Sequence, residues 1–126
     1  MDCPVAVSLH PVLADKLSVA LETVVLNELE RRGAEVGYVK TVDGAEVDFL
    51  ARHVDAGEEL IQVCADPSAR ETLARELGGL AAAAKHHRRA VKRLLVLDRD
   101  ALVRVSEASV RVQPAYEWLL SQPGER

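Results

Sequence analysis

A hairpin signal in the first half of this 126-residue chain constrains the fold more than any other feature of the sequence. Two β-rich runs, 35–40 and 45–51, are joined around Asp43 and Gly44. An Asp-Gly pair tolerates the positive φ angles of a tight hairpin turn, so the two runs predict antiparallel strands. A third β-rich run, 59–64, predicts another strand. The sequence therefore predicts a three-stranded antiparallel meander.

A long amphipathic helix precedes the meander. Apolar residues recur at helical spacing over residues 11–32, and Gly33 follows as a residue that commonly ends helices. We expect one stripe of this helix to be buried. It consists of Leu13, Leu17, Leu21, Val24, Val25 and Leu29.

A second helix follows the meander. Ser68 and Glu71 near its start have the spacing of a capping box. Gly78 and Gly79 lie inside this helix, where each glycine costs about 1 kcal/mol relative to alanine. We therefore expect a kink or close packing at these two glycines.

The last third of the chain predicts one buried strand and two short elements. Residues 93–98 contain the continuous apolar run 94–97, which is typical of a strand buried on both faces. A short strand at 109–113 and a terminal helix at 114–120 follow. The order helix, three strands, helix, strand predicts one α/β domain over 1–126, with a central mixed sheet flanked by helices and residues 1–10 as a tail.

The composition argues against several classes of protein. A net charge of −4 argues against a generalist DNA-binding protein, and 3% aromatic residues leave few platforms for base stacking. Cys3 and Cys64 lie far apart, which matches neither a disulfide framework nor a zinc motif and indicates a reducing compartment. The sequence shows no membrane-spanning run and no signal peptide, so we expect a cytoplasmic location and no membrane partner.

Polar residues on the predicted second and third strands form a candidate metal-dependent site. In an antiparallel meander Asp48 can lie beside Gln62 and Cys64, which share one strand face. A carboxylate late in the first predicted helix precedes these strand residues and completes the candidate site. Hydrolysis of a phosphodiester with Mg²⁺ requires hard oxygen ligands, a metal-activated water and a nearby positive charge.

Three segments carry a resemblance to a known family: LETVVLNELERRG at 21–33, VKTVDGAEVDFL at 39–50 and LIQVC at 60–64. They resemble a domain of unknown function at the C-terminus of many prokaryotic AAA+-type ATPases, within the PD-(D/E)XK nuclease-like superfamily. The resemblance covers residues 13–120, and its most specific part is 44–49. It implies a restriction-endonuclease-like fold and, for an excised domain, an ATPase domain in the same longer chain.

The resemblance also assigns four site positions. Glu22 matches the glutamate of the family's first helix, and Asp48 matches its metal-binding aspartate. Gln62 stands where glutamate or sometimes glutamine occurs, so Asp48 and Gln62 are the implied metal ligands. Cys64 stands where active members have lysine. A neutral thiol supplies no positive charge, and Gln62 removes a negative charge from the site. We therefore expect no cofactor; the alternative, an active site, would use Mg²⁺.

Glu28 is an alternative acid on the same helix. It lies near the centre of the apolar stripe, whereas Glu22 lies at the margin of that stripe. A glutamate on a buried stripe must be paired or protonated. The family motif ranks Glu22 above Glu28.

A basic cluster runs from Lys85 to Arg89 and continues with Lys92 and Arg93. Arg88, Arg89 and Lys92 are candidates for contacts with nucleic-acid phosphates or with an acidic protein partner. The simpler interpretation is a solvated helix end whose cations complement the helix dipole.

Two functions follow from these observations. The preferred one is a non-catalytic interaction module, the C-terminal domain of an AAA+-type ATPase, which contacts protein or nucleic acid. The alternative is a Mg²⁺-dependent DNA endonuclease in which Lys40 replaces the missing lysine. An enzyme requires Glu22, Asp48 and Gln62 to converge on one metal-sized point with a cation beside it.

Overall fold

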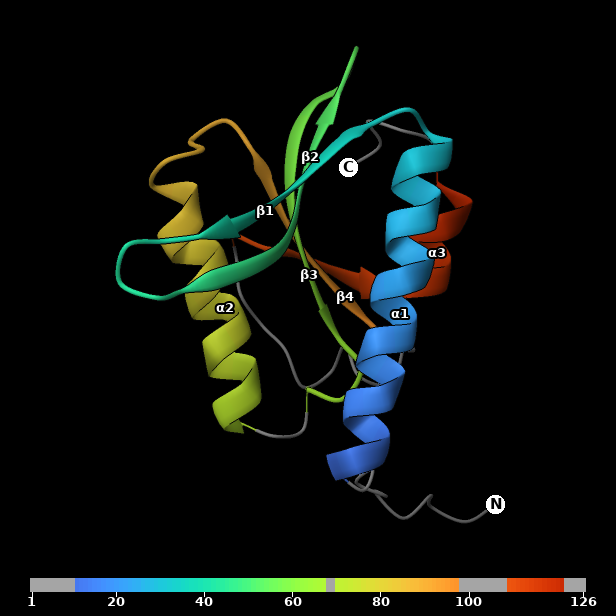
Figure 1. Ribbon diagram of the computed structural model, residues 1–126, viewed down its shortest axis with the longest axis vertical. Helices are drawn as coiled ribbons and strands as arrows, with labels where there is room; N and C mark the ends of the chain where they lie inside the picture. The colour runs from blue at the N-terminus through green and yellow to red at the C-terminus, as the bar shows by residue number, and fades with distance from the viewer. Residues whose placement is uncertain (1–10, 68–69, 98–108, 122–126) are drawn as a thin grey trace.

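The computed structural model describes residues 11–67, 70–97 and 109–121 (Figure 1). The predicted order of helices and strands is confirmed within these ranges. In chain order the elements are α1 (Pro11–Arg31), β1 (Glu35–Lys40), β2 (Glu46–His53), β3 (Gly57–Cys64), α2 (Arg70–Ala84), β4 (Val91–Val96), β5 (Arg111–Pro114) and α3 (Ala115–Leu120). The predicted tail at 1–10 and the capping residue Ser68 lie outside the described residues.

The five strands form one mixed sheet in the order β1-β2-β3-β4-β5. Strands β1, β2 and β3 are the predicted antiparallel meander, because successive strands joined by short turns must run in opposite directions. Strands β4 and β5 both run parallel to their neighbours. A parallel partner for β3 requires a crossover connection, and α2 provides it.

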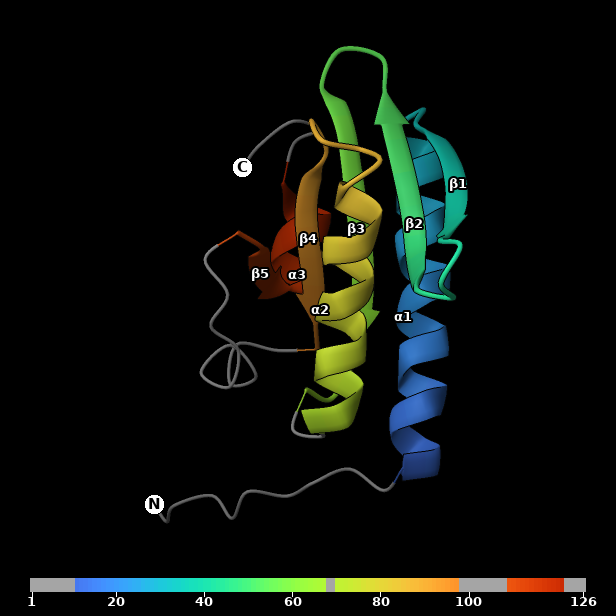
Figure 2. The same cartoon turned by 90° about the vertical axis from the view of Figure 1, so that its left-hand side faces the viewer.

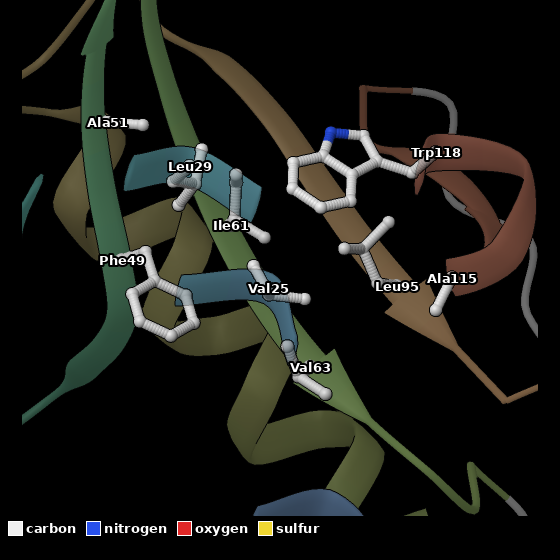
Figure 3. Close-up of a cluster of buried hydrophobic side chains, with 9 residues drawn as sticks. All are labelled: Val25, Leu29, Phe49, Ala51, Ile61, Val63, Leu95, Ala115 and Trp118. Carbon is white, nitrogen blue, oxygen red and sulfur yellow. The ribbon is translucent and has the colours of Figure 1, made fainter. Parts of the chain in front are cut away.

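Helices cover both faces of the sheet. Helix α2 packs against β2, β3 and β4 on one face, while α1 and α3 pack together on the other (Figures 1 and 2). The α1 face holds the larger apolar cluster, in which Trp118 and Leu29 are almost fully buried (Figure 3). The other members are Val25, Phe49, Ala51, Ile61, Val63, Leu95 and Ala115. No helix in the described parts of the chain is long and apolar enough to cross a lipid bilayer.

A β-bulge interrupts strand β2 near its start. Gly37 pairs with Leu50 and Val39 pairs with Val47, so two residues of β2 oppose a single residue of β1. These two residues of β2 are Asp48 and Phe49. A bulge bends its strand and redirects side chains, which places Asp48 where the regular sheet is locally disrupted.

Two details of the predictions are wrong. Val24 is 42% exposed, because α1 rests on the sheet through Val25 and Leu29 and the angular step of a helix carries Val24 away from that contact. The fourth strand begins at 91 and ends at 96, not at 98. The parallel pairing of β4 with β3 runs from Val91 opposite Glu59 to Val96 opposite Cys64.

Candidate functional site

Asp48 lies at the point where β2 and β3 separate. The paired register between these strands begins with Phe49 opposite Ile61, so Asp48 precedes the regular ladder. The Asp48 carboxylate replaces a ladder bond there: its Oδ2 accepts the backbone N–H of Val63 at 2.9 Å. Burial of Asp48 raises the pKa of its carboxyl despite this hydrogen bond.

Gln62 joins three elements through its side-chain amide. Its Oε1 accepts the backbone N–H of Asp48 at 2.8 Å. Its Nε2 donates to the carbonyl oxygen of Glu46 at 2.8 Å and to that of Glu76 at 3.2 Å. The residue is 2% exposed, so these bonds satisfy a buried amide and connect β3 to β2 and to α2.

Gly79 explains how α2 comes close enough for these bonds. A Cβ at Gly79 would lie 2.3 Å from the carbonyl oxygen of Glu46 and 2.9 Å from Nε2 of Gln62. A Cβ at Gly78 would have no such neighbour within 4 Å. Close packing was one of the two outcomes expected for the glycine pair, and it occurs at Gly79.

A cleft of about 520 Å³ opens beside these residues between the β1–β2 turn and α2. Its lining contains four carboxylates and one guanidinium, so its character is acidic. The lining residues are Asp43, Gly44, Ala45, Glu46, Asp48, Gln62, Arg75, Glu76, Gly78 and Gly79.

Glu76 is a member of this acidic group that the sequence analysis missed. Its pKa is raised to about 7, mainly by burial and in part by the negative charges of Asp48, Glu22 and Glu46, against the opposing effect of Arg75. A signal was present in the sequence, because Glu76 lies three residues after Leu73 and four before Leu80. A carboxylate on a buried helical stripe indicates a special environment.

Glu22 reaches the same group from α1. It is half-buried, and burial together with the charge of Asp48 raises the pKa of its carboxyl. Asp48 and Gln62 are therefore joined by a hydrogen bond, and the charge of Asp48 acts on both Glu22 and Glu76, although Glu22 does not line the cleft.

Cys64 does not line the cleft. It is 2% exposed and packs with Leu94 and Val96 of β4 and with Leu73 and Leu77 of α2. Burial raises the pKa of its thiol to about 11, so the side chain is a protonated core group at neutral pH.

Both implied metal ligands make hydrogen bonds within the protein. Oε1 of Gln62 accepts the backbone N–H of Asp48, and Oδ2 of Asp48 accepts that of Val63. Within residues 11–67, 70–97 and 109–121, no three Asp, Glu, His or Cys side chains are grouped to hold one metal ion. Mg²⁺ sites are built from several convergent oxygen ligands.

Glu28 has a structural task at the other end of α1. Its carboxylate lies 2.6 Å from Nη2 of Arg31 and 2.7 Å from Nε of Arg32, and these partners hold its pKa at about 2. Arg32 lies over the ring of Trp118 at 4.6 Å and donates to the carbonyl oxygens of Trp118 and Ser121. Glu28 thus helps to fasten α3 to α1, and it does not line the cleft.

The basic cluster is divided between surface and interior. Arg88 and Arg89 are exposed, while Nζ of Lys92 donates to Oγ of Ser109 at 3.0 Å. Arg93 had been grouped with these cations, and this grouping is wrong. It is 3% exposed because both faces of β4 are covered, and its guanidinium pairs with Glu59 at 3.1 Å.

Comparisons with known proteins do not identify the chain. No protein-family model matches it, and neither a curated protein nor a solved structure gives a significant match.

Proposed function

We propose that this chain is a non-catalytic interaction module of restriction-endonuclease-like fold. The observation that carries the proposal is the side chain of Gln62, whose oxygen and amide nitrogen are all directed at backbone groups. A residue in this arrangement connects two strands and a helix, which is a structural task.

The surroundings of Gln62 support the same proposal. Cleavage of a phosphodiester needs positive charge near the developing negative charge of the transition state. The position that resembles the family lysine holds a buried, protonated thiol, Cys64. The cleft's one lining cation, Arg75, faces four carboxylates, so the cleft as a whole repels phosphate.

The family resemblance supplies the biological setting of the proposal. A domain of this kind would work as the C-terminal part of a longer AAA+-type ATPase and would contact protein or nucleic acid. A cytoplasmic location belongs to the same proposal.

The alternative function, a Mg²⁺-dependent endonuclease, has one observation in its favour. Glu22, Asp48 and Glu76 all have raised pKa values, mainly through burial and in part through repulsion by neighbouring carboxylates, and a divalent cation would relieve that repulsion. The proposed substitute lysine, Lys40, is exposed and pairs across the sheet with Glu46, a cleft residue.

A cleavage assay separates the two functions. The full chain and the Asp48→Asn variant are incubated with linear, single-stranded and branched DNA in Mg²⁺ or Mn²⁺. We expect equal, background-level cleavage by both proteins, and calorimetry with Mn²⁺ should show no binding that depends on Asp48. Metal-dependent cleavage by the parent that disappears in Asp48→Asn would establish the endonuclease instead.

A further inference from the structure

The turn between α2 and β4 concentrates positive charge in an acidic chain. Residues 85–93 contain five of the sixteen basic residues and none of the twenty acidic ones. Lys85, Arg88 and Arg89 are exposed, and Lys92 is half-buried. These four residues are called the basic turn below. The segment that joins α2 to β4 lies on the opposite side of the molecule from α1 (Figure 1).

The helix dipole does not account for this concentration. Helix α2 ends at Ala84 and has no basic residue in its last turn. The dipole stabilises cations only within about one turn of a helix end, so its effect extends from Lys85 to Arg88 at most. The charges of Arg89 and Lys92 lie beyond it.

The backbone of the basic turn is held in place by hydrogen bonds. His86 N–H donates to the carbonyl oxygen of Ala83 at 3.0 Å, and Ala90 N–H donates to that of His87 at 3.0 Å. Nδ1 of His87 also lies 3.7 Å from a carboxylate oxygen of Glu58 on β3. Cations on an ordered backbone lose less entropy when a partner binds.

The neighbouring charges decide which kind of anion fits. The pKa of Asp43 is lowered, mainly by the Thr41 hydroxyl and in part by the charge of Lys85, so the basic turn adjoins the acidic cleft. A DNA duplex carries a phosphate about every 1.7 Å along its axis and extends well beyond four side chains. Such a polyanion would meet the cleft carboxylates and the net charge of −4.

We propose that the basic turn docks a short acidic segment of a protein partner. A short peptide carries fewer negative charges than a duplex and needs to cover less of the acidic surface beside the turn. Guanidinium groups suit this role because each can bind a carboxylate through two parallel hydrogen bonds. The inference rests on the proposed interaction module and gives that module a surface and a class of partner.

Fluorescence anisotropy with the full chain tests the inference. The probe is a labelled glutamate-rich peptide of about a dozen residues, which matches the few cations of the turn. The reference ligands are the same peptide with glutamine for glutamate and a labelled DNA duplex. The test variant is Arg88→Glu with Arg89→Glu. The control variant is Lys16→Glu with Thr23→Glu and Asn27→Glu, which changes the net charge equally at exposed positions of α1.

We expect the glutamate peptide to bind more tightly than the glutamine peptide or the duplex. Reversal at Arg88 and Arg89 should weaken this binding about tenfold or more, whereas the control should stay within about twofold of the parent at moderate salt. Circular dichroism checks that both variants are folded, and Arg88→Gln with Arg89→Gln replaces the reversal if that variant unfolds.

Three results would overturn the inference. These are no binding of the glutamate peptide at low salt, equal weakening in the test and control variants, and tighter binding of the duplex than of the peptide. None of them bears on catalysis, so the cleavage assay still judges the proposed function independently.

Discussion

Two polar clusters interrupt the apolar packing on the sheet, one at each end of strands β2 and β3. At the β2–β3 turn, the Glu59 side chain is buried, with 5% of the residue exposed, and pairs with Arg93. Arg93 also donates to Gln113, and Nε2 of His53 lies 3.3 Å from Glu59. At the other end, the carboxylates of Asp48 and Glu76 line the cleft, and each has a raised pKa.

The difference between the clusters lies in how negative charge is compensated. At the β2–β3 turn a buried cation neutralises a buried carboxylate, so the cluster contributes to stability as long as both partners are present. At the cleft, hydrogen bonds to Gln62 and to backbone groups organise the site while its carboxylates outnumber its cation. One cluster therefore depends on an ion pair and the other on close packing.

Loss of the buried cation should give the largest effect. Arg93→Met leaves the Glu59 carboxylate buried without its ion-pair partner, and we expect stability to fall by about 3–5 kcal/mol. Urea unfolding at neutral pH measures the change. Arg52→Met is the control, because Arg52 is exposed and its pairs with Glu35 and Glu58 are worth at most about 1 kcal/mol. Similar losses in the two variants would show that the buried pair is not special.

Packing at the cleft should be tested with the glycine pair of α2. Gly79→Ala places a methyl group against the carbonyl of Glu46, and we expect a loss of about 1–3 kcal/mol from overpacking. Gly78→Ala is the matched control, because nothing lies within 4 Å of its Cβ position. That substitution should stabilise the helix by about 0.5–1 kcal/mol. Opposite signs in thermal unfolding support the close contact, and two gains would refute it.

The smallest expected effect concerns the protonation of Glu76. Its pKa in the folded protein, about 7, exceeds its value of 4.5 in the unfolded chain, so the folded state holds the proton more tightly. Stability should therefore decline as pH rises from about 4.5 to 7, and the penalty should persist above pH 7. Glu76→Gln should remove it, with a gain on the order of 1 kcal/mol at pH 8 after allowance for solvent screening, and little gain at pH 4.5.

The Glu28→Gln variant sharpens this pH comparison, because the pKa of Glu28 is lowered in the folded protein whereas that of Glu76 is raised. The pKa of Glu28 is held at about 2 in the folded protein, so its stabilising contribution is present above pH 4.5 and is lost as pH falls toward 2. We expect this variant to lose stability at pH 8. If the two variants respond to pH in the same direction, the assigned charge environments are incorrect.

The order of secondary structure was predictable from the sequence because local signals specify it. The turn around Asp43 and Gly44 requires a positive φ, and Gly44 adopts 91° there. Gly33 after α1 adopts 78° for the same local reason. The spacing of polar residues on β2 and β3 also anticipated that Asp48 and Gln62 would be neighbours, as their 2.8 Å hydrogen bond confirms.

The roles of the site residues were decided by the tertiary structure. A sequence pattern placed Cys64 at a catalytic position, but the packing of α2 on β4 makes it a core side chain. The position of Arg93 in a basic run suggested a surface cation, yet packing on both faces of β4 buries it beside Glu59. Glu76 joined the acidic group only because Gly79 lets α2 approach the sheet. Local propensity specifies elements, whereas the partner of a polar side chain depends on which distant segments pack around it.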